Sequence, residues 1–517
     1  MVMRILCMAG ILLSVFSTQL ATAQTAELPN ILIVFVDDMG YGDSRVYNPE
    51  STVPMPNLDR LAENGMVFTD AHSTSGVCAP TRYSMLTGNY PWRGRNENGT
   101  WSYNAECQIL DGQKTIGDLA QPAGYETAIF GKQHLGGHFY SKENPDSFFH
   151  GRTTDDLQQI DFSRRFRMGP LDWGFDYSYV LLGGIQSEPY VFFENDLPVC
   201  DANELIMWQK GKYGYSSIPG TGPGMPDYNS TAVGPMMTRK ALDFIDRHHQ
   251  ANVQKGTSRP FLMHYCTQVL HTPCTPPETF NGQKVRGSTF SPATDMLVEV
   301  DITLGLFVDA LQSRNLLDNT LIIFTADNGG WIHTQYLEQG HSTSGSLRGM
   351  KGQIWEGGHR VPFIARWGST IKAGSRSNQL IGVQDVFATL ADIAGQTPDE
   401  NQGLDSQSFL PELLRQSTGS SRDHMMMQAR YFDADYKQQV VKQDSKNKHL
   451  LKEAYALRND DWKLIIDKDS LTPVGLFNLE HDLGEQYNLI DKPEQKDRVQ
   501  NMMQQYYAIR KSRRSTP

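Results

Sequence analysis

The most informative residues surround one cysteine, Cys78, in the segment C-A-P-T-R (Cys78–Arg82), which is followed by L-T-G at 86–88. Pro80 suits the first turn of a helix, where the missing proline N–H is not needed. The start of a helix directs free N–H groups toward an anion, and Arg82 adds a planar cationic fork. The segment therefore suits an anion site at the start of a helix that begins near Cys78. The alternative is a buried structural cysteine in front of a helix.

Two pairs of oxygen-bearing side chains each follow an apolar run. Asp37-Asp38 comes after residues 31–36, and Asp327-Asn328 comes after residues 321–324. Each pair alone could be an ordinary acidic turn. Together they form an oxygen-rich set of the kind that binds a hard cation such as Ca²⁺, whereas Mg²⁺ prefers to keep several waters. We therefore expect one metal site built from Asp37, Asp38, Asp327 and Asn328.

Further candidates are basic or histidine residues in similar positions. Lys132 and His134 follow the apolar run 127–130, and the alternation of a strand places both on one side. His271 follows the run 261–265, and Lys351 lies in a glycine-rich block at 348–362. Taken singly, these would be a solvated face, a structural histidine and a surface lysine. Near Cys78 they predict an anion-binding and proton-transferring cluster.

The four apolar runs indicate the scaffold. Unbroken apolar segments are typical of strands buried on both faces, as in a parallel sheet covered by helices. In such sheets the ligand site lies beyond the carboxyl ends of the strands, which is where the candidate residues occur. Helical periodicity is found at 58–63, 238–249, 295–314 and 384–394. The sequence predicts an α/β fold, a large domain with a central, mostly parallel sheet between helices.

Two other regions have a different character. Residues 140–235 are rich in Gly, Pro, Asp and aromatic residues, and we expect long loops over the site. Beyond residue 400, short strands are predicted at 454–457, 462–466 and 475–479, followed by a terminal amphipathic helix at 492–513. This pattern predicts a large catalytic domain at 24–400 and a small C-terminal α+β subdomain with a short antiparallel sheet at 401–517.

The N-terminus and the net charge limit the location and partners of the protein. Arg4, an apolar stretch at 5–16 and A-T-A at 21–23 have the form of a signal peptide, residues 1–23. The stretch is too short for a membrane span, so export to the periplasm or beyond is expected, without membrane insertion. With a net charge of −11, the chain of 517 residues is not a general nucleic-acid binder.

Cleavage after residue 23 would leave an odd number of cysteines. They are Cys78, Cys107, Cys200, Cys266 and Cys274. An odd number leaves one thiol to explain, and Cys78 is the simplest choice. The pairing of the other four cannot be determined from the sequence, although Cys266 and Cys274 are near enough in the chain to be a plausible pair.

Several motifs together resemble those of one enzyme family. Cys78–Gly88 fits C-x-P-x-R-x-x-x-L-T-G, residues 131–136 resemble G-K-W-H-L-G, and residues 324–330 resemble F-T-S-D-N-G-G. Residues 348–362 fit R-G-x-K-x-x-x-W-E-G-G-x-R-V-P. These segments resemble the formylglycine-dependent sulfatases, arylsulfatase-like members of the alkaline phosphatase superfamily, and point to a bacterial carbohydrate sulfatase. Departures from the family pattern are Gln133, Ala326 and Leu270, which stand where Trp, Ser and Pro are usual.

The resemblance implies a mechanism. A maturase would oxidise Cys78 to formylglycine (3-oxoalanine), whose hydrate attacks sulfur with one hydroxyl and expels sulfate with the other. Ca²⁺ would be bound by the formylglycine oxygen and by Asp37, Asp38, Asp327 and Asn328. The other roles implied are as follows: Arg82 holds the nucleophile, Lys132 neutralises sulfate, His134 accepts a proton, and His271 and Lys351 protonate the leaving alcohol. Loss of the metal would destabilise the fold through repulsion among three carboxylates.

The substrate and two rival functions remain open at this point. Export and long loops suit a sulfated polysaccharide or oligosaccharide, such as an algal galactan or a glycosaminoglycan. The first rival is a phosphonate or phosphate monoester hydrolase on the same scaffold, since some of these also use formylglycine. The second is a non-catalytic carbohydrate-binding relative, which would have lost its nucleophile or metal ligands.

Overall fold

A computed structural model describes residues 27–97, 99–101, 105–149, 158–416, 422–431 and 452–512. The predicted signal peptide, residues 1–23, lies outside these ranges. The core is a ten-stranded sheet in the order β19-β2-β18-β17-β1-β14-β4-β7-β8-β9. Its five central strands run parallel; they are β17 (Thr320–Ala326), β1 (Asn30–Val36), β14 (Phe261–Cys266), β4 (Glu126–Lys132) and β7 (Tyr177–Leu181).

The central strands confirm the expectation drawn from the apolar runs. Every residue of β1, β14 and β17 is buried, as two covered faces require. Ile31 of β1 pairs with Leu262 on one side and Leu321 on the other, so the strands are nearly in step. Because the strands are parallel and in register, their carboxyl ends lie at one edge of the sheet.

The outer strands make the sheet mixed. Antiparallel pairing joins β17 to β18 (Phe363–Arg366) and β18 to β2 (Met66–Phe68). At that same edge of the sheet, β19 (Ser375–Ser377) runs parallel to β2. At the opposite edge, β8 (Phe193–Glu194) is antiparallel to β7, and β9 (Leu197–Pro198) is antiparallel to β8. The sheet is therefore parallel at its centre and mixed at its edges, in agreement with the predicted fold class.

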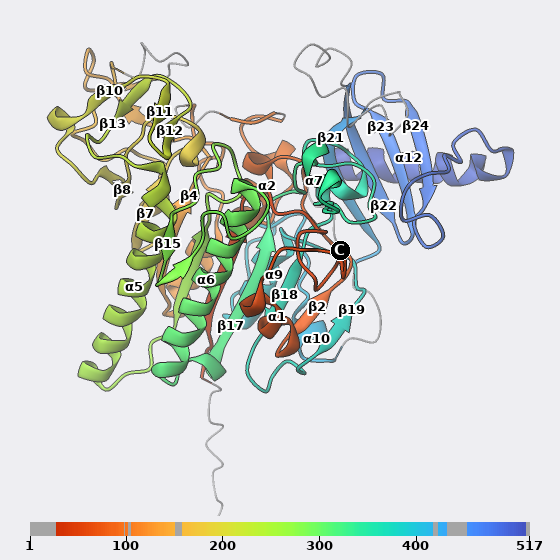
Figure 1. Cartoon of the computed structure of the whole chain (residues 1–517). Coiled ribbons are helices and arrows are strands. Elements are labelled where there is room, and N and C mark those ends of the chain that lie inside the picture. The colour runs from red at the N-terminus through yellow and green to blue at the C-terminus, as the bar shows by residue number, and fades with distance from the viewer. Residues whose placement is uncertain are drawn as a thin grey trace, which may run out of the picture.

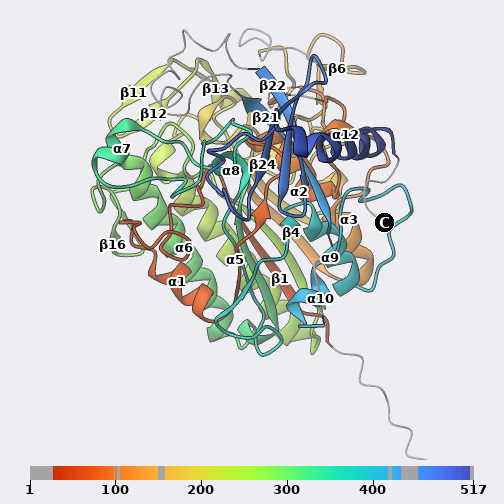
Figure 2. The same cartoon turned by 90° about the vertical axis from the view of Figure 1, so that its right-hand side faces the viewer.

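Helices cover both faces of the sheet (Figure 2). One layer contains α1 (Pro56–Glu63), α5 (Val233–Lys255) and α6 (Pro292–Ser313). The other contains α3 (Ile116–Ala120) and α9 (Asp385–Ile393), and α2 (Cys78–Thr87) packs against both. The four helices predicted from periodicity are confirmed, although α5 is longer at both ends than 238–249.

The expectation of loops over 140–235 is only partly correct. Strand β7 lies within this region and joins the central sheet beside β4. Two small hairpins also form: β10 (Ile206–Trp208) with β13 (Gly222–Gly224), and β11 (Gly211–Tyr213) with β12 (Ser216–Ile218). Short aromatic-rich strands such as Y-S-Y-V-L are stabilised by tertiary pairing, which the local composition does not reveal.

A second sheet follows the first along the chain (Figure 1). Strands β21 (His424–Tyr431), β22 (Lys452–Asn459), β23 (Trp462–Asp467) and β24 (Pro473–Asn478) are antiparallel. Helix α12 (Lys496–Lys511) packs on this sheet through Met502, Tyr506 and Ile509. The small antiparallel sheet and its helix were predicted, but β21 was not. Within the described ranges, no helix is long and apolar enough to cross a membrane.

The cysteines are all free thiols in the described chain. Cys266 and Cys274 do not form the pair that their spacing allowed. Instead, Cys266 Sγ lies 3.1 Å from Nε2 of His264, and Cys274 Sγ lies 3.7 Å from the Leu270 carbonyl oxygen.

Candidate active site

The predicted site residues meet at the carboxyl edge of the central sheet. Asp37 and Asp38 follow β1, Asp327 and Asn328 follow β17, and Lys132 ends β4. Helix α2 begins at Cys78 at this same end of the sheet (Figure 1). The topology thus brings together residues that are almost 300 positions apart in the sequence.

Three buried carboxylates each contact a buried cation. Arg82 Nη2 donates to Asp327 Oδ2 at 2.6 Å, and Lys132 Nζ donates to Asp37 Oδ2 at 2.7 Å. Lys351 Nζ contacts Asp38 Oδ1. Burial alone would raise the pKa of Asp37, but Lys132 and Arg82 hold it far below its ordinary value. The formal charges of the six groups cancel, so the repulsion expected among bare carboxylates is compensated.

The same group has unused oxygen ligands. Asp37 Oδ1, Asp38 Oδ2 and Asn328 Oδ1 are buried side-chain oxygens without a hydrogen-bond partner. One ligand atom each of Asp37, Asp327 and Cys78 lie within 4.8 Å of one another. Buried polar atoms normally have partners, and carboxylate and amide oxygens are the ligands of hard cations. The donor set therefore fits a metal ion at this position.

The candidate nucleophile lies at the first position of α2. Cys78 is buried, and its Sγ lies 3.4 Å from Nδ1 of His134. Burial raises the pKa of the Cys78 thiol, an effect that Lys132 and Lys351 oppose, so unmodified Cys78 is mainly a neutral thiol at pH 7. Burial, together with Lys132 and Arg82, holds the pKa of His134 well below its ordinary value. A neutral His134 can accept a proton from a group on residue 78.

The turn that carries His134 depends on close backbone contact. Gly131 has a φ of +87°, and a Cβ at this position would lie 1.7 Å from the carbonyl oxygen of Cys266 on β14. Only glycine allows β4 and β14 to approach in this way. His134 itself has a φ of +58°, in the left-handed region. This bend redirects the chain so that His134 reaches Cys78.

His271 joins the cluster although Leu270 replaces the usual proline. It is half-buried, and its Nδ1 lies 2.8 Å from the Thr272 carbonyl oxygen. Burial lowers the pKa of His271; the nearby Asp38 carboxylate opposes this, while Lys132 and Lys351 add to it. The structure therefore brings all the predicted catalytic and metal-binding residues into one site.

Backbone contacts from β21 were not predicted from the sequence. Gly76 N donates to the Gln428 carbonyl and Gln428 N to the Thr74 carbonyl, both at 3.0 Å. Ile354 N donates to the Arg430 carbonyl at 2.8 Å. One strand of the second sheet thus holds both the segment before Cys78 and the segment after Lys351. No short-range pattern in the sequence reports such a contact.

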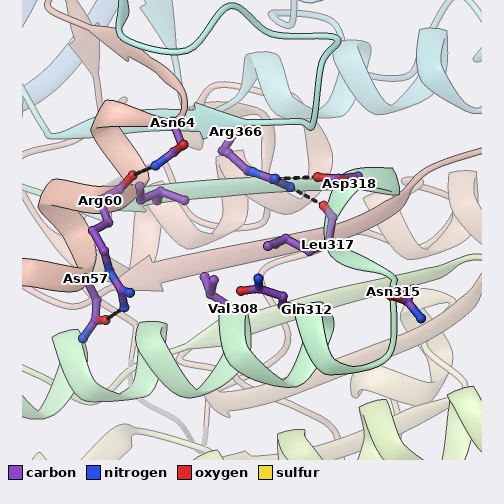
Figure 3. A pocket seen from close by; sticks show the side chains of 10 residues that line it. Asn57, Arg60, Asn64, Val308, Gln312, Asn315, Leu317, Asp318 and Arg366 are labelled. Atoms are coloured by element: carbon purple, nitrogen blue, oxygen red, sulfur yellow. Dashed lines mark hydrogen bonds and ion pairs between the residues drawn. The ribbon is translucent and has the colours of Figure 1, made fainter.

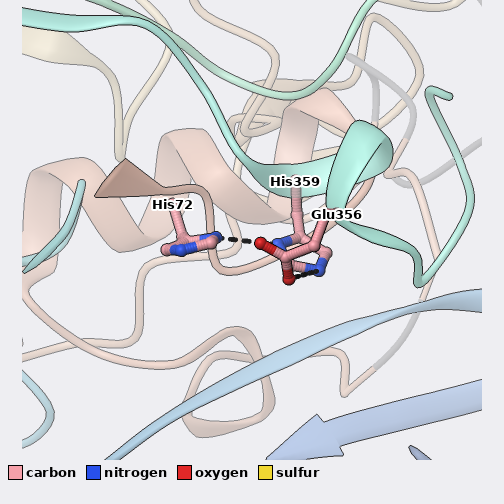
Figure 4. A group of neighbouring side chains, drawn as sticks. All are labelled: His72, Glu356 and His359. Carbon is pink, nitrogen blue, oxygen red and sulfur yellow. Dashed lines mark hydrogen bonds and ion pairs between the residues drawn. The ribbon is translucent and has the colours of Figure 1, made fainter. Parts of the chain in front are cut away.

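A second group with metal-ligand chemistry lies away from Cys78. His72, Glu356 and His359 are buried together, with the two Nδ1 atoms 3.0 Å apart (Figure 4). Lys463 Nζ lies 2.9 Å from His359 Nε2 and 3.1 Å from Glu356 Oε1, and Arg360 also pairs with Glu356. Protein cations already neutralise this carboxylate, so the group is an ion-pair network that joins helix α8 to β23 of the second sheet. Sequence reasoning missed it, although Glu356 and His359 lie in the W-E-G-G block.

A polar hollow lies at the opposite end of the sheet (Figure 3). Its walls come from α1, α6 and the segment before β17, where Arg366 pairs with Asp318 at 2.9 Å. It contains none of the predicted site residues. Because β17 begins here and Asp327 follows its other end, the hollow is separated from the Cys78 site by the length of the strand.

Comparison with known proteins identifies similar sequences. The profile of the Sulfatase family matches residues 29–396, and the profile of the N-sulphoglucosamine sulphohydrolase C-terminal region matches residues 350–512. An N-acetylgalactosamine-6-O-sulfatase of Bacteroides thetaiotaomicron is 32% identical over 441 residues, 78% of this chain and 80% of that protein. Human N-acetylgalactosamine-6-sulfatase is 31% identical over 405 residues, 75% of this chain and 66% of that protein.

Solved structures show the same similarity in three dimensions. One, from a study of the metabolism of multiple glycosaminoglycans by Bacteroides thetaiotaomicron, superposes with a TM-score of 0.75 at 27% sequence identity. The superposition covers 94% of this chain and all of the other. The similarity therefore includes both the central sheet and the second sheet.

Proposed function

Since this chain belongs to the sulfatase family and is a sulfuric ester hydrolase, we propose that it releases sulfate from a sulfated carbohydrate after Cys78 has been oxidised to formylglycine by a maturase. The observation that carries the proposal is the position of Cys78. It begins α2, faces Nδ1 of His134, and lies beside the carboxylate–cation pairs. A structural cysteine would not need these charged neighbours.

The metal in this proposal is Ca²⁺, bound by Asp37, Asp38, Asp327, Asn328 and residue 78. The three unpartnered oxygens support this choice, because a hard cation would satisfy them. When bound, the cation supplies positive charge for the nucleophile and the sulfate oxygens. The protein contributes ligands that are already buried and held by Arg82 and Lys132.

The modified residue would supply the nucleophile and, through its second hydroxyl, the group that releases sulfate. Lys132 and Arg82 provide fixed positive charge, which needs no rearrangement during the reaction. His134, neutral because of its low pKa, accepts a proton at Nδ1 from the hydroxyl beside it. This assignment gives each buried charged residue near Cys78 a separate task.

Two residues are candidates for protonating the leaving oxygen. Burial opposes the charge on Lys351, but the Asp38 carboxylate outweighs it and raises the pKa of Lys351. His271 has a lowered pKa and is mainly neutral. At neutral pH, Lys351 is therefore the residue that carries a proton, and His271 is better suited to orient the leaving group through Nε2.

The names of the relatives suggest where to look for the substrate. We propose a carbohydrate sulfate of the glycosaminoglycan or algal galactan type, with 6-O-sulfated N-acetylgalactosamine as the first candidate. Export by residues 1–23 would bring the enzyme to such extracellular polymers. We also propose that residues 401–517 form a subdomain that stabilises the site through β21.

Paired esters of one alcohol test the function. The matured, Ca²⁺-loaded enzyme is given the sulfate and the phosphate monoester of the same sugar, and the matching phosphonate monoester. We expect kcat/KM to favour the sulfate by roughly tenfold or more, because the relatives that this chain resembles are sulfatases. Equal or faster hydrolysis of the phosphate or phosphonate would establish the rival activity instead.

A further inference from the structure

We propose that Trp331 forms a wall against which a pyranose ring of the substrate stacks, beside the cluster that holds the sulfate. The inference rests on the proposed carbohydrate sulfatase function and names a residue that determines which alcohol is accepted. It is carried by the position of Trp331, its exposure and the side chains that surround it.

The backbone of Trp331 is fixed at the edge of the catalytic cluster. The residue directly follows the Asp327–Gly330 turn, and the Gly330 carbonyl accepts a hydrogen bond of 2.9 Å from Lys351 N. The Trp331 carbonyl accepts one of 3.1 Å from Thr343 Oγ1. The indole is therefore presented by a rigid segment, which lowers the entropic cost of using it for binding.

The side chain is open although it is large and apolar. Trp331 is 38% exposed, and Lys351 Nζ lies 5.9 Å from its ring centroid. An exposed tryptophan beside a group of buried charges is unusual for packing, because tryptophan is mostly buried in folded proteins. Its exposed face is next to the place where the alcohol part of a sulfate ester would lie.

Trp331 also lines a small cavity whose wall includes the carboxylate residue Asp38. The cavity volume is about 30 Å³, room for only one or two water molecules, so a sugar ring would lie on the exposed face of Trp331 at the mouth of the cavity. Leu270 and Tyr336 add apolar surface, whereas Thr272 and His333 add polar groups. Leu270 therefore contributes a different apolar surface to this cavity from the one that the usual proline would give.

These walls match the chemistry of a sugar. A pyranose has an apolar face of C–H groups and an edge of hydroxyls, so it can stack on an aromatic ring while its hydroxyls meet polar side chains. Burial lowers the pKa of His333, which leaves it neutral and able to donate or accept a hydrogen bond. The anionic part of the substrate would remain with Lys132, Arg82 and Lys351.

Competitive inhibition can separate the sugar from the sulfate. The matured, metal-loaded enzyme hydrolyses 4-nitrophenyl sulfate as the reporter, with N-acetylgalactosamine or inorganic sulfate as inhibitor. For Trp331→Ala we expect the inhibition constant of the sugar to rise roughly tenfold, while that of sulfate changes less than about twofold. Trp331→Phe should retain most of the sugar affinity. Tyr487→Ala, at a residue that is 73% exposed and outside the cavity, is the matched control and should change neither constant.

The possible outcomes are distinct. If both constants rise together in Trp331→Ala, the ring acts through the charge of Lys351, and the stacking proposal is wrong. If neither rises, or if phenylalanine fails to rescue the sugar affinity, Trp331 does not contact the sugar. If the wild-type enzyme cleaves the reporter but neither binds the sugar nor cleaves any sulfated sugar, the proposed substrate class itself fails. Equal melting temperatures of the variants exclude a folding defect.

Discussion

Removal of the divalent cation is expected to abolish hydrolysis but leave the protein folded. The three carboxylates of the site already contact Lys132, Arg82 and Lys351. The sequence alone suggested that they would repel one another without a metal. The ion pairs compensate this repulsion, because each carboxylate is beside a cation and the formal charges cancel.

The expected change in the free energy of unfolding follows from mass action. A cation present at 100 times its dissociation constant stabilises the folded state by about 2.7 kcal/mol, and chelation removes only this amount. Arg82→Ala should cost more, about 3–5 kcal/mol, because it leaves Asp327 buried without its ion-pair partner. It also removes the 2.9 Å hydrogen bond from Arg82 Nη1 to the Lys132 carbonyl.

Denaturant unfolding with and without chelator measures these differences, with sulfate release followed in the same samples. The matched control is Arg366→Ala. Its partner Asp318 is 91% exposed, so the loss should be within about 1 kcal/mol. Activity should return when Ca²⁺ is restored to the chelated protein. If chelation unfolds the protein, or destabilises it more than Arg82→Ala does, the ion pairs do not compensate the carboxylates and the reasoning is wrong.

The remaining predictions concern the nucleophile, the leaving group and pH. Mass spectrometry of the peptide containing residue 78 from active enzyme should show the loss of sulfur, and an unmodified cysteine in fully active enzyme would contradict this. Cys78→Ser should lower activity by several orders of magnitude, since serine has no second hydroxyl to release sulfate. Substituting His271 by alanine should slow sugar sulfates far more than 4-nitrophenyl sulfate, because His271 is proposed to orient the leaving oxygen toward the proton of Lys351 and a phenolate needs little protonation to leave. Equal effects on kcat/KM for the two substrates would remove this orienting role. Burial raises the pKa of Glu299 to about 8, although Gln268 donates a hydrogen bond to it. The contribution of protonated Glu299 to stability is therefore complete below about pH 4.5 and is lost as the pH rises to about 8. Over this range the free energy of unfolding should fall by a few kcal/mol less in Glu299→Gln than in the wild type. Parallel curves of unfolding free energy against pH would show that Glu299 is not protonated in the folded state.

The central strands could be predicted because a strand buried on both faces has an unbroken run of apolar residues in its sequence. Strand β1, with residues N-I-L-I-V-F-V, cannot be solvated on either side. Strand β21 was missed because its sequence, H-M-M-M-Q-A-R-Y, has methionines of no strong strand preference and no alternation. Its stability comes from pairing with β22 and from contacts beside Cys78, which are both long-range.

The convergence of the candidate residues at one edge of the sheet could be predicted for a related reason. Parallel strands have their carboxyl ends at one edge, so polar residues that follow separate apolar runs must converge. The partner of each residue could not be predicted, because the conformation of a long side chain such as Lys132 depends on the whole site. The network of Glu356 and Lys463 was missed on the same grounds, since Glu356 lies in helix α8 and Lys463 in β23 of the second sheet, more than 100 positions apart in the sequence.

The charge balance of the site gives the metal a second role. The protein carries a net charge of −11 and offers an anionic substrate no long-range attraction. The local group of three carboxylates and three cations is formally neutral, so it does not provide that attraction either. A dication bound to the free oxygens would leave the site with two net positive charges in a buried region, where electrostatic interactions are strongest. The carboxylates can thus hold the lysines and arginine in place before the metal binds, and the metal would then add the net positive charge with which these cations together attract sulfate.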